Sequence, residues 1–128
     1  MISVWQAPSA GAPLERGQRP ALEPAADELV LEVMHCGLCH SDLSMIGNHW
    51  GVSRYPLVPG HEVIGKVTAV GEGVDPGLIG EVRGLGWISG SCNHCSLCLG
   101  GDQNLCSSLE ATIVGRQGGF ASHVVARQ

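Results

Sequence analysis

The sequence is poor in aromatic side chains and has no long hydrophobic run. Its 128 residues include one Phe, one Tyr and three Trp, so the hydrophobic 44% consists mostly of Ala, Val, Leu and Ile. No stretch approaches the length of a membrane-spanning helix, which predicts no membrane partner. The opening segment MISVWQAPSAG lacks the basic start and the apolar run of a signal peptide, so we expect a cytoplasmic location.

A basic stripe is also missing. The formal net charge is −5, and charges of both signs are scattered along the chain, so nucleic acid is not an expected partner. There is no internal repeat and no dinucleotide fingerprint. The nearest approach is Gly71–Pro76, whose sixth position is Pro and which no apolar helix follows. We interpret that segment as a turn.

Glycine is abundant, with 19 residues, which favours many turns and few long helices. Four prolines interrupt residues 6–24, which predicts surface chain with at most short pairing. Residues 36–50 have room for one or two helical turns that end at Gly47. The pattern predicts strands at 2–5, 29–35, 61–71, 82–88 and 119–126, the third with a glycine bulge. The predicted fold class is mostly β, a barrel-like or sandwich domain.

Four cysteines gather in one short segment, SCNHCSLCLGGDQNLC. Four thiolates so close together suit one tetrahedral ion, and zinc is the usual occupant of a closed four-sulfur site. Disulfides are a weaker interpretation, because cysteines three apart bond poorly to each other and no oxidising compartment is indicated. An iron site would favour two separated CxxC turns. The predicted ligands are Cys92, Cys95, Cys98 and Cys106.

A second group of metal-binding residue types lies in two other segments. Cys39 begins the run Cys-His-Ser-Asp, and His61 and Glu62 follow a Pro-Gly pair. A thiolate, an imidazole and a carboxylate from separate loops are what an open catalytic zinc site uses. Asp42 is a candidate acceptor for the second N–H of the ligand imidazole. Ser41 could take up the proton of an alcohol bound to zinc.

Each of these residues also has an ordinary structural interpretation. A lone cysteine usually belongs to the core, a His-Glu pair at a strand start usually lies on the surface, and Ser-Asp often caps a helix. Cys36 has no assigned partner, and we expect a buried free thiol. Cys36 and Cys39 also share the CxxC spacing of a thiol redox switch, although the βαβ context of such motifs is absent.

Taken together, four segments resemble the zinc-dependent alcohol dehydrogenases of the medium-chain dehydrogenase/reductase superfamily, in the style of its cinnamyl and yeast-type members. These segments are CGLCHSDL, YPLVPGHEVIGKVTAVGEGV, GWISGSCNHCSLCLGGDQNLC and GGFASHVVA. The resemblance implies a GroES-like, partly open β-barrel catalytic domain with short helices over residues 1–128. It also implies that residues 89–108 form a structural zinc lobe.

The resemblance implies a role for each matching residue. Cys39 and His61 match catalytic zinc ligands, and Glu62 matches an adjacent residue that sometimes coordinates. Ser41 matches the start of the proton relay, and His40 a residue near the coenzyme pyrophosphate. Trp50 and Trp87 match positions that line the substrate pocket, and Cys92, Cys95, Cys98 and Cys106 match the structural zinc ligands.

Three departures from the family pattern stand out. The chain is shorter than family members, so the third cysteine ligand of the catalytic zinc and the Rossmann domain would lie beyond Gln128. Ser44 stands where many members carry a relay histidine, so the proton would leave by water or through His40 or His49. The usual Gly-Asp-Arg-Val is here Gly-Glu-Val-Arg, which moves the arginine to Arg83.

The resulting hypothesis is a zinc- and NAD(P)-dependent enzyme that interconverts primary alcohols and aldehydes. The full-length enzyme is expected to be a homo-oligomer, and these 128 residues alone are expected to be inactive because they lack the coenzyme site. A second hypothesis is a metal-stabilised binding or assembly module without chemistry, since a fold does not fix a function.

Overall fold

The computed structural model describes residues 1–128, and every strand pair in it is antiparallel. No helix has the length and apolar character that crossing a bilayer would need. The elements in chain order are β1 (Ile2–Gln6), β2 (Glu15–Arg19), β3 (Glu28–Cys36), α1 (His40–Ile46), β4 (Val63–Val70), η1 (Pro76–Leu78), β5 (Val82–Leu85), β6 (Ile88–Gly90), α2 (Ser96–Leu99), η2 (Gln103–Leu105), β7 (Glu110–Ala111) and β8 (His123–Arg127).

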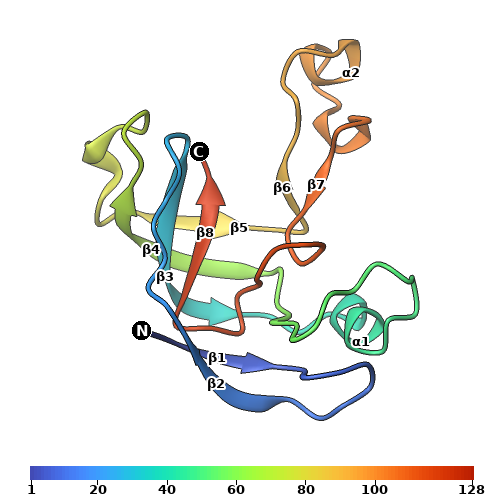
Figure 1. The fold of residues 1–128 in the computed structure, drawn as a ribbon. Helices are drawn as coiled ribbons and strands as arrows, with labels where there is room; N and C mark the ends of the chain where they lie inside the picture. The colour runs from blue at the N-terminus through green and yellow to red at the C-terminus, as the bar shows by residue number, and fades with distance from the viewer.

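A four-stranded sheet in the order β5-β4-β3-β8 forms the centre of the molecule (Figure 1). Strand β4 alternates buried and exposed residues along most of its length, so one face of the sheet packs inward. The β1–β2 hairpin lies beside this sheet, and β6 and β7 leave it to carry a separate lobe outward. The main core cluster consists of Leu29, Leu31, Val63, Val67, Leu85, Val124 and Ala126.

The pairing of β3 with β4 brings two distant segments of the chain together. Cys36 pairs with Val63 at the ends of the two strands, and the Gly37 N–H then donates to the Glu62 carbonyl oxygen at 2.9 Å. The chain therefore leaves β3 toward Cys39 at the place where it arrives at β4 from His61.

The predicted glycine bulge in β4 is corrected by the structure. The register of the β3–β4 pair shifts at two places, between Val30 and Leu31 and between Val33 and His35. At the second shift the extra residue lies in β3, opposite Gly65, rather than at the glycine. Gly65 is needed for close approach instead, since a Cβ there would lie 2.7 Å from the Glu32 carbonyl oxygen.

Several predicted boundaries also change, while the mostly β class is confirmed. The expected strand at 82–88 is two strands, because the chain turns between Leu85 and Ile88. The expected strand at 61–71 begins only at Val63, and the expected strand at 119–126 begins at His123. The predicted short helix ends at Gly47 as expected. No pattern in the sequence predicted strand β7.

The proline-containing stretch 6–24 holds a strand that the sequence did not predict. Strand β2 pairs with all five residues of β1. Its sequence, ERGQR, has no apolar side chain, and none of its five residues is buried, so it lacks the apolar alternation that marks a strand. Pro13 and Pro20 flank the strand and leave its N–H groups free to pair.

Arg116 links the lobe to the central sheet. Its guanidinium contacts the Glu28 carboxylate on β3 and the Glu110 carboxylate on β7, each at 3.2 Å. Arg127 on β8 also contacts Glu110, at 2.9 Å. The Glu28 side chain is only 15% exposed, so the pair is well shielded from solvent.

We expect Arg116→Ala to lower the free energy of unfolding by about 1–3 kcal/mol, because it leaves the shielded Glu28 carboxylate without its cation. Urea unfolding followed by tryptophan fluorescence measures the change. Arg83→Ala is the matched control, since Arg83 pairs with Glu81 at the surface and both side chains are nearly half exposed; its effect should stay below about 1 kcal/mol. Equal effects of the two variants would contradict the expectation.

Candidate metal centres

Cys39 lies at the boundary between β3 and α1. It is the N-cap residue of α1, in extended conformation, and the Asp42 carboxylate accepts a hydrogen bond from its backbone N–H at 2.9 Å. A carboxylate three residues into a helix is a common partner for the N-cap N–H. This local contact fixes the turn that presents Cys39.

His61 is oriented by the same carboxylate. Asp42 is fully buried, and its Oδ1 lies 3.0 Å from His61 Nδ1 and accepts from the Gly60 N–H at 2.8 Å. A carboxylate can only accept, so Nδ1 is the ring nitrogen that donates to Asp42, and Nε2 is the other one. Asp42 thus ties the Cys39 loop to the His61 loop and leaves one imidazole nitrogen free to bind a metal.

Cys39, His61 and Glu62 form a cluster whose ligand atoms all lie within 4.8 Å of one another. His61 is buried, Cys39 is half-buried and Glu62 is exposed. A sulfur, an imidazole nitrogen and a carboxylate oxygen fit the donor preferences of zinc, and three ligands leave a fourth position open. The structure brings these three predicted residues together.

Two tryptophans extend the cluster toward an open cavity. The Trp87 ring meets the His61 ring edge to face, with centroids 4.9 Å apart and planes at 85°. Trp50 meets Trp87 in the same way at 6.0 Å. Trp87, His61 and Glu62 help to line a cavity of about 550 Å³ that continues along β4 and β5. Of the two predicted pocket tryptophans, Trp87 therefore contacts His61 and lines the cavity, whereas Trp50 packs on Trp87 and is not among the lining residues.

The remaining predicted residues of this site lie on α1. Ser41 is half-buried in the first turn, His40 is exposed beside it, and Ser44 is buried one turn later. His49, the other histidine considered for proton exit, is exposed after the helix. Helix α1 therefore buries Asp42 and Ser44 and leaves His40 exposed to solvent.

The four cysteines of the lobe form a second cluster, again with all ligand atoms within 4.8 Å of one another. Cys95 caps the short helix α2, and Cys106 follows η2. Asn93 and Gly101 adopt positive φ, 61° and 92°, in the turns that fold the lobe back on itself. The two sulfurs of Cys92 and Cys98 are 3.8 Å apart, and no cysteine of the chain is in a disulfide.

Backbone N–H groups point at the sulfurs of this lobe. Cys92 N–H donates to the Cys106 sulfur at 3.4 Å, Cys95 N–H to the Cys92 sulfur at 3.3 Å, and Cys98 N–H to the Cys95 sulfur at 3.4 Å. Hydrogen bonds from the backbone N–H groups of His94 and Cys95 lower the pKa of Cys92 to about 6. Cys92 therefore favours the thiolate, the form that binds metal.

Cys36 differs from the prediction of a buried thiol, because it is only partly buried. Its sulfur packs on two glycines: a Cβ on Gly60 would lie 2.8 Å from it, and one on Gly119 3.1 Å. Burial raises the pKa of the Cys36 thiol, and the charges of Asp42 and Glu62 add to that effect. A raised pKa keeps Cys36 in the unreactive thiol form, which disfavours the redox-switch interpretation.

Two glycines of the site were not singled out from the sequence. Gly60, just before His61, has φ of 100°, and any Cβ on it would crowd Cys36 and Phe120. A Cβ on Gly37 would collide with the Glu62 carboxylate. Their positions in the sequence could have indicated a role in the site, since each glycine stands one or two residues before a candidate ligand.

Comparison with known proteins gives one family. Residues 25–128 match the profile of the alcohol dehydrogenase GroES-like domain. The aldehyde reductase AdhA of Synechocystis sp. is 50% identical over 127 residues, which cover 99% of this chain and 38% of that protein. The chain thus spans well under half the length of this relative.

Solved structures agree in fold. The cinnamyl alcohol dehydrogenase SbCAD4 of Sorghum bicolor superposes with a TM-score of 0.87 at 35% identity, covering all of this chain and 39% of that one. The alcohol dehydrogenase rspB of Escherichia coli, solved in complex with NADH, superposes with a TM-score of 0.85 at 32% identity, covering 98% of this chain and 36% of that one. The predicted GroES-like architecture is confirmed.

Proposed function

The chain belongs to the alcohol dehydrogenase GroES-like domain family, and we propose that it is the zinc-holding catalytic domain of an NAD(P)-dependent enzyme that interconverts primary alcohols and aldehydes. The observation that carries the proposal is the approach of Cys39, His61 and Glu62 to within 4.8 Å. The names of the relatives, an aldehyde reductase and a cinnamyl alcohol dehydrogenase, support the substrate class. Residues 89–108 form the structural zinc lobe in this proposal.

In the catalytic site, Cys39 and His61 Nε2 are the proposed zinc ligands, with Glu62 as a third or exchanging ligand. Zinc held there would supply Lewis acidity toward the oxygen of an alcohol or aldehyde. Asp42 holds the His61 ring and stabilises the tautomer that binds metal. The exposure of Glu62 allows it to leave the cluster while the two less exposed ligands stay in place.

Proton transfer is assigned to α1. The Ser41 hydroxyl, half-buried in the first turn, takes the alcohol proton. Since Ser44 replaces the histidine common in the family, the proton passes to solvent by water or by the exposed His40 or His49. His40 is also the proposed contact for the coenzyme pyrophosphate.

The substrate lies in the cavity beside His61 against the lining residue Trp87, with Trp50, which packs on Trp87, as the proposed second wall. Two perpendicular indole rings offer flat apolar walls, which suit the body of an aliphatic or aromatic primary alcohol. The small Ser41 leaves room beside the reacting carbon. We propose no macromolecular substrate for this cavity.

The coenzyme requires a binding site that these 128 residues do not provide, because their sequence contains no dinucleotide fingerprint. We therefore expect the 128-residue chain by itself to show no NAD(P)-linked turnover. The NADH complex of the rspB relative supports a nicotinamide coenzyme for the whole enzyme. A homo-oligomer is proposed for that whole enzyme as well.

We expect His61→Ala to keep the fold and to lose one of two zinc ions per chain, because only the Cys39 cluster loses a ligand. Metal analysis of protein purified without chelator, together with the thermal midpoint, measures both properties. His35→Ala is the control, since His35 is exposed on β3 and outside both clusters. One zinc in the unmodified chain would contradict a preformed catalytic site, and loss of both ions in His61→Ala would contradict two independent sites.

Cobalt replacement tests the chemistry. In the cobalt-loaded chain, a primary aldehyde that binds at the metal should change the visible absorption of the ion in the Cys39 cluster, and His61→Ala should abolish that change. The alternative function, a metal-stabilised module without chemistry, would give no role to Cys39, His61 and Glu62. An aldehyde-insensitive spectrum would favour that alternative.

A further inference from the structure

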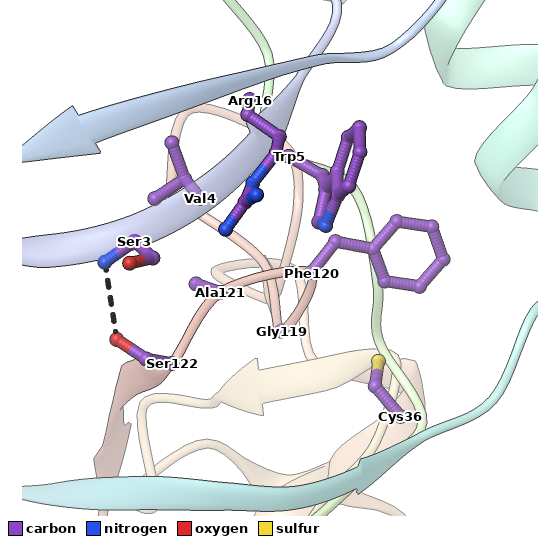
Figure 2. A pocket seen from close by; sticks show the side chains of 9 residues that line it. All are labelled: Ser3, Val4, Trp5, Arg16, Cys36, Gly119, Phe120, Ala121 and Ser122. Carbon is purple, nitrogen blue, oxygen red and sulfur yellow. Dashed lines mark hydrogen bonds between the residues drawn. The ribbon is translucent and has the colours of Figure 1, made fainter.

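A second cavity lies between the β1–β2 hairpin and residues 119–122 (Figure 2). Its volume is about 320 Å³, within the range of pockets that bind small organic molecules. None of its lining residues lines the cavity beside His61. We propose that this cavity is a binding site for a small carboxylate with a flat apolar body.

The charge of the lining selects an anion. Arg16 is the one charged residue among the lining residues, and no acidic side chain lines the cavity. Arg16 takes part in none of the ion pairs of the molecule. The end of its side chain points toward Ala121 (Figure 2), another lining residue of the cavity. An unpaired guanidinium offers the two parallel N–H donors that a carboxylate matches.

The shape of the lining favours a flat ligand. The Arg16 guanidinium carbon lies 5.9 Å from the centroid of the Trp5 ring, a cation–π contact that restrains both side chains. The Phe120 side chain lies across from Arg16 and beside Trp5 (Figure 2). A phosphate would find one cation and aromatic walls, whereas an aromatic carboxylate can place its charge on Arg16 and its ring against the aromatic side chains.

Further donors surround the same space. The Ser122 hydroxyl oxygen accepts from the Ser3 N–H at 3.2 Å, which fixes the edge of the cavity. The Ser3 hydroxyl and the Trp5 indole N–H also belong to lining side chains. At the opposite end, burial raises the pKa of the Cys36 thiol. The thiol therefore contributes an uncharged surface at that end of the cavity.

Because this cavity lies close to the candidate catalytic site, a test must separate binding at these two places. Cys36 and Phe120 both pack against Gly60, the residue before His61. The cavity thus borders the candidate catalytic site, and a carboxylate could also bind a zinc ion held there. A readout that reports the two places separately is available, because Trp5 lines this cavity while Trp50 and Trp87 stand beside His61.

The experiment is a titration of the zinc-loaded chain with sodium benzoate at constant ionic strength, followed by the NMR signals of the three indole N–H groups. Trp5→Phe identifies the Trp5 signal. We expect that signal to shift with saturation, while the signals of Trp50 and Trp87 stay in place. Arg16→Gln should weaken the binding by about tenfold or more, because it removes a charge-assisted bidentate contact.

Two further variants complete the test. Arg54→Gln, which neutralises an exposed arginine outside the cavity, should bind benzoate like the unmodified chain. His61→Ala should also keep the Trp5 shift. The proposal is overturned by the absence of a saturable Trp5 shift, by equal binding in Arg16→Gln, or by shifts of Trp50 and Trp87 that disappear in His61→Ala. The last result overturns the proposal when Trp5 does not shift with them. It would then place benzoate on the catalytic metal, so it would leave the proposed function standing.

Discussion

Replacing Asp42 with alanine is expected to lower the free energy of unfolding by about 3–5 kcal/mol, the usual cost of removing one partner from a buried charged network. The Asp42 carboxylate is fully buried and accepts from three N–H groups, those of Cys39, Gly60 and the His61 ring. All three donors would lose their acceptor at once, and no other acceptor to any of them is present in the structure.

The same change should remove the metal from the Cys39 cluster. Asp42 connects the two loops that carry Cys39 and His61, so the loops would no longer be held at ligand distance. Urea unfolding gives the free energy, and metal analysis gives the zinc content. Asp102→Ala is the control, because Asp102 is exposed and caps no donor with its side chain. A stability within about 1 kcal/mol of the unmodified chain would show that the network is not what joins the loops.

Asp42→Asn adds a finer test of the geometry. An amide keeps one oxygen for Gly60 and His61 but directs its NH₂ group at the Cys39 N–H, so a donor meets a donor. We therefore expect a loss intermediate between those of the unmodified chain and Asp42→Ala. An asparagine as stable as aspartate would indicate that the Cys39 N–H contact contributes little.

The two groups of candidate ligands could be predicted from the sequence because metal ligands depend on residue type, and the structure brings each group together. Cysteine, histidine and carboxylate side chains are rare enough in these combinations that Cys92, Cys95, Cys98 and Cys106 are recognisable by spacing alone. The match of Cys39 with His61 needed more, since the two residues are 22 positions apart and meet only through the β3–β4 pairing. Residue type suggested that match, and the resemblance to a family supported it before the structure did.

Strand β2, the cavity beside Cys36 and the place of the bulge could not be predicted from the sequence. Strand β2 is polar on both faces, so hydrophobic periodicity did not mark it. Without β2 there was no reason to bring Arg16 next to Trp5, and the cavity beside Cys36 could not be foreseen. The bulge opposite Gly65 was also misplaced, because a glycine in a strand can mark either an extra residue or a close approach of backbone.

Cys106→Ser is expected to remove the metal from the lobe and to leave the lobe without a fixed structure. Apart from its cysteines the lobe has almost no core: Leu97, Leu99 and Leu105 are exposed, and the residues buried there are Cys98, Cys106 and the polar Ser89. The β6–β7 ladder that carries it has two residue pairs. With so little apolar burial, the metal is the main source of folding free energy in this part of the chain.

The expected result is one zinc ion per chain instead of two, a thermal midpoint lower by several degrees, and rapid protease cleavage between residues 91 and 108. Serine is the smallest change available, since it exchanges the Cys106 sulfur for a hydroxyl, a far weaker zinc ligand. Cys36→Ser is the matched control, because Cys36 lies outside both clusters and should leave both metals in place. An unchanged midpoint in Cys106→Ser would contradict a structural role for the lobe metal.

The two variants together test whether the sites are independent. The Cys106 sulfur accepts from the N–H groups of Cys92 and Ser108, both within the lobe, whereas every donor to the Asp42 carboxylate lies in the two loops of the Cys39 cluster. The link between lobe and sheet is made by Arg116, Arg127 and Glu110, none of which belongs to either cluster. Cys106→Ser should therefore keep the Cys39-cluster metal, and Asp42→Ala should keep the lobe metal. If either variant lost both ions, the clusters would be coupled, and the lobe would have to be counted as part of the catalytic site.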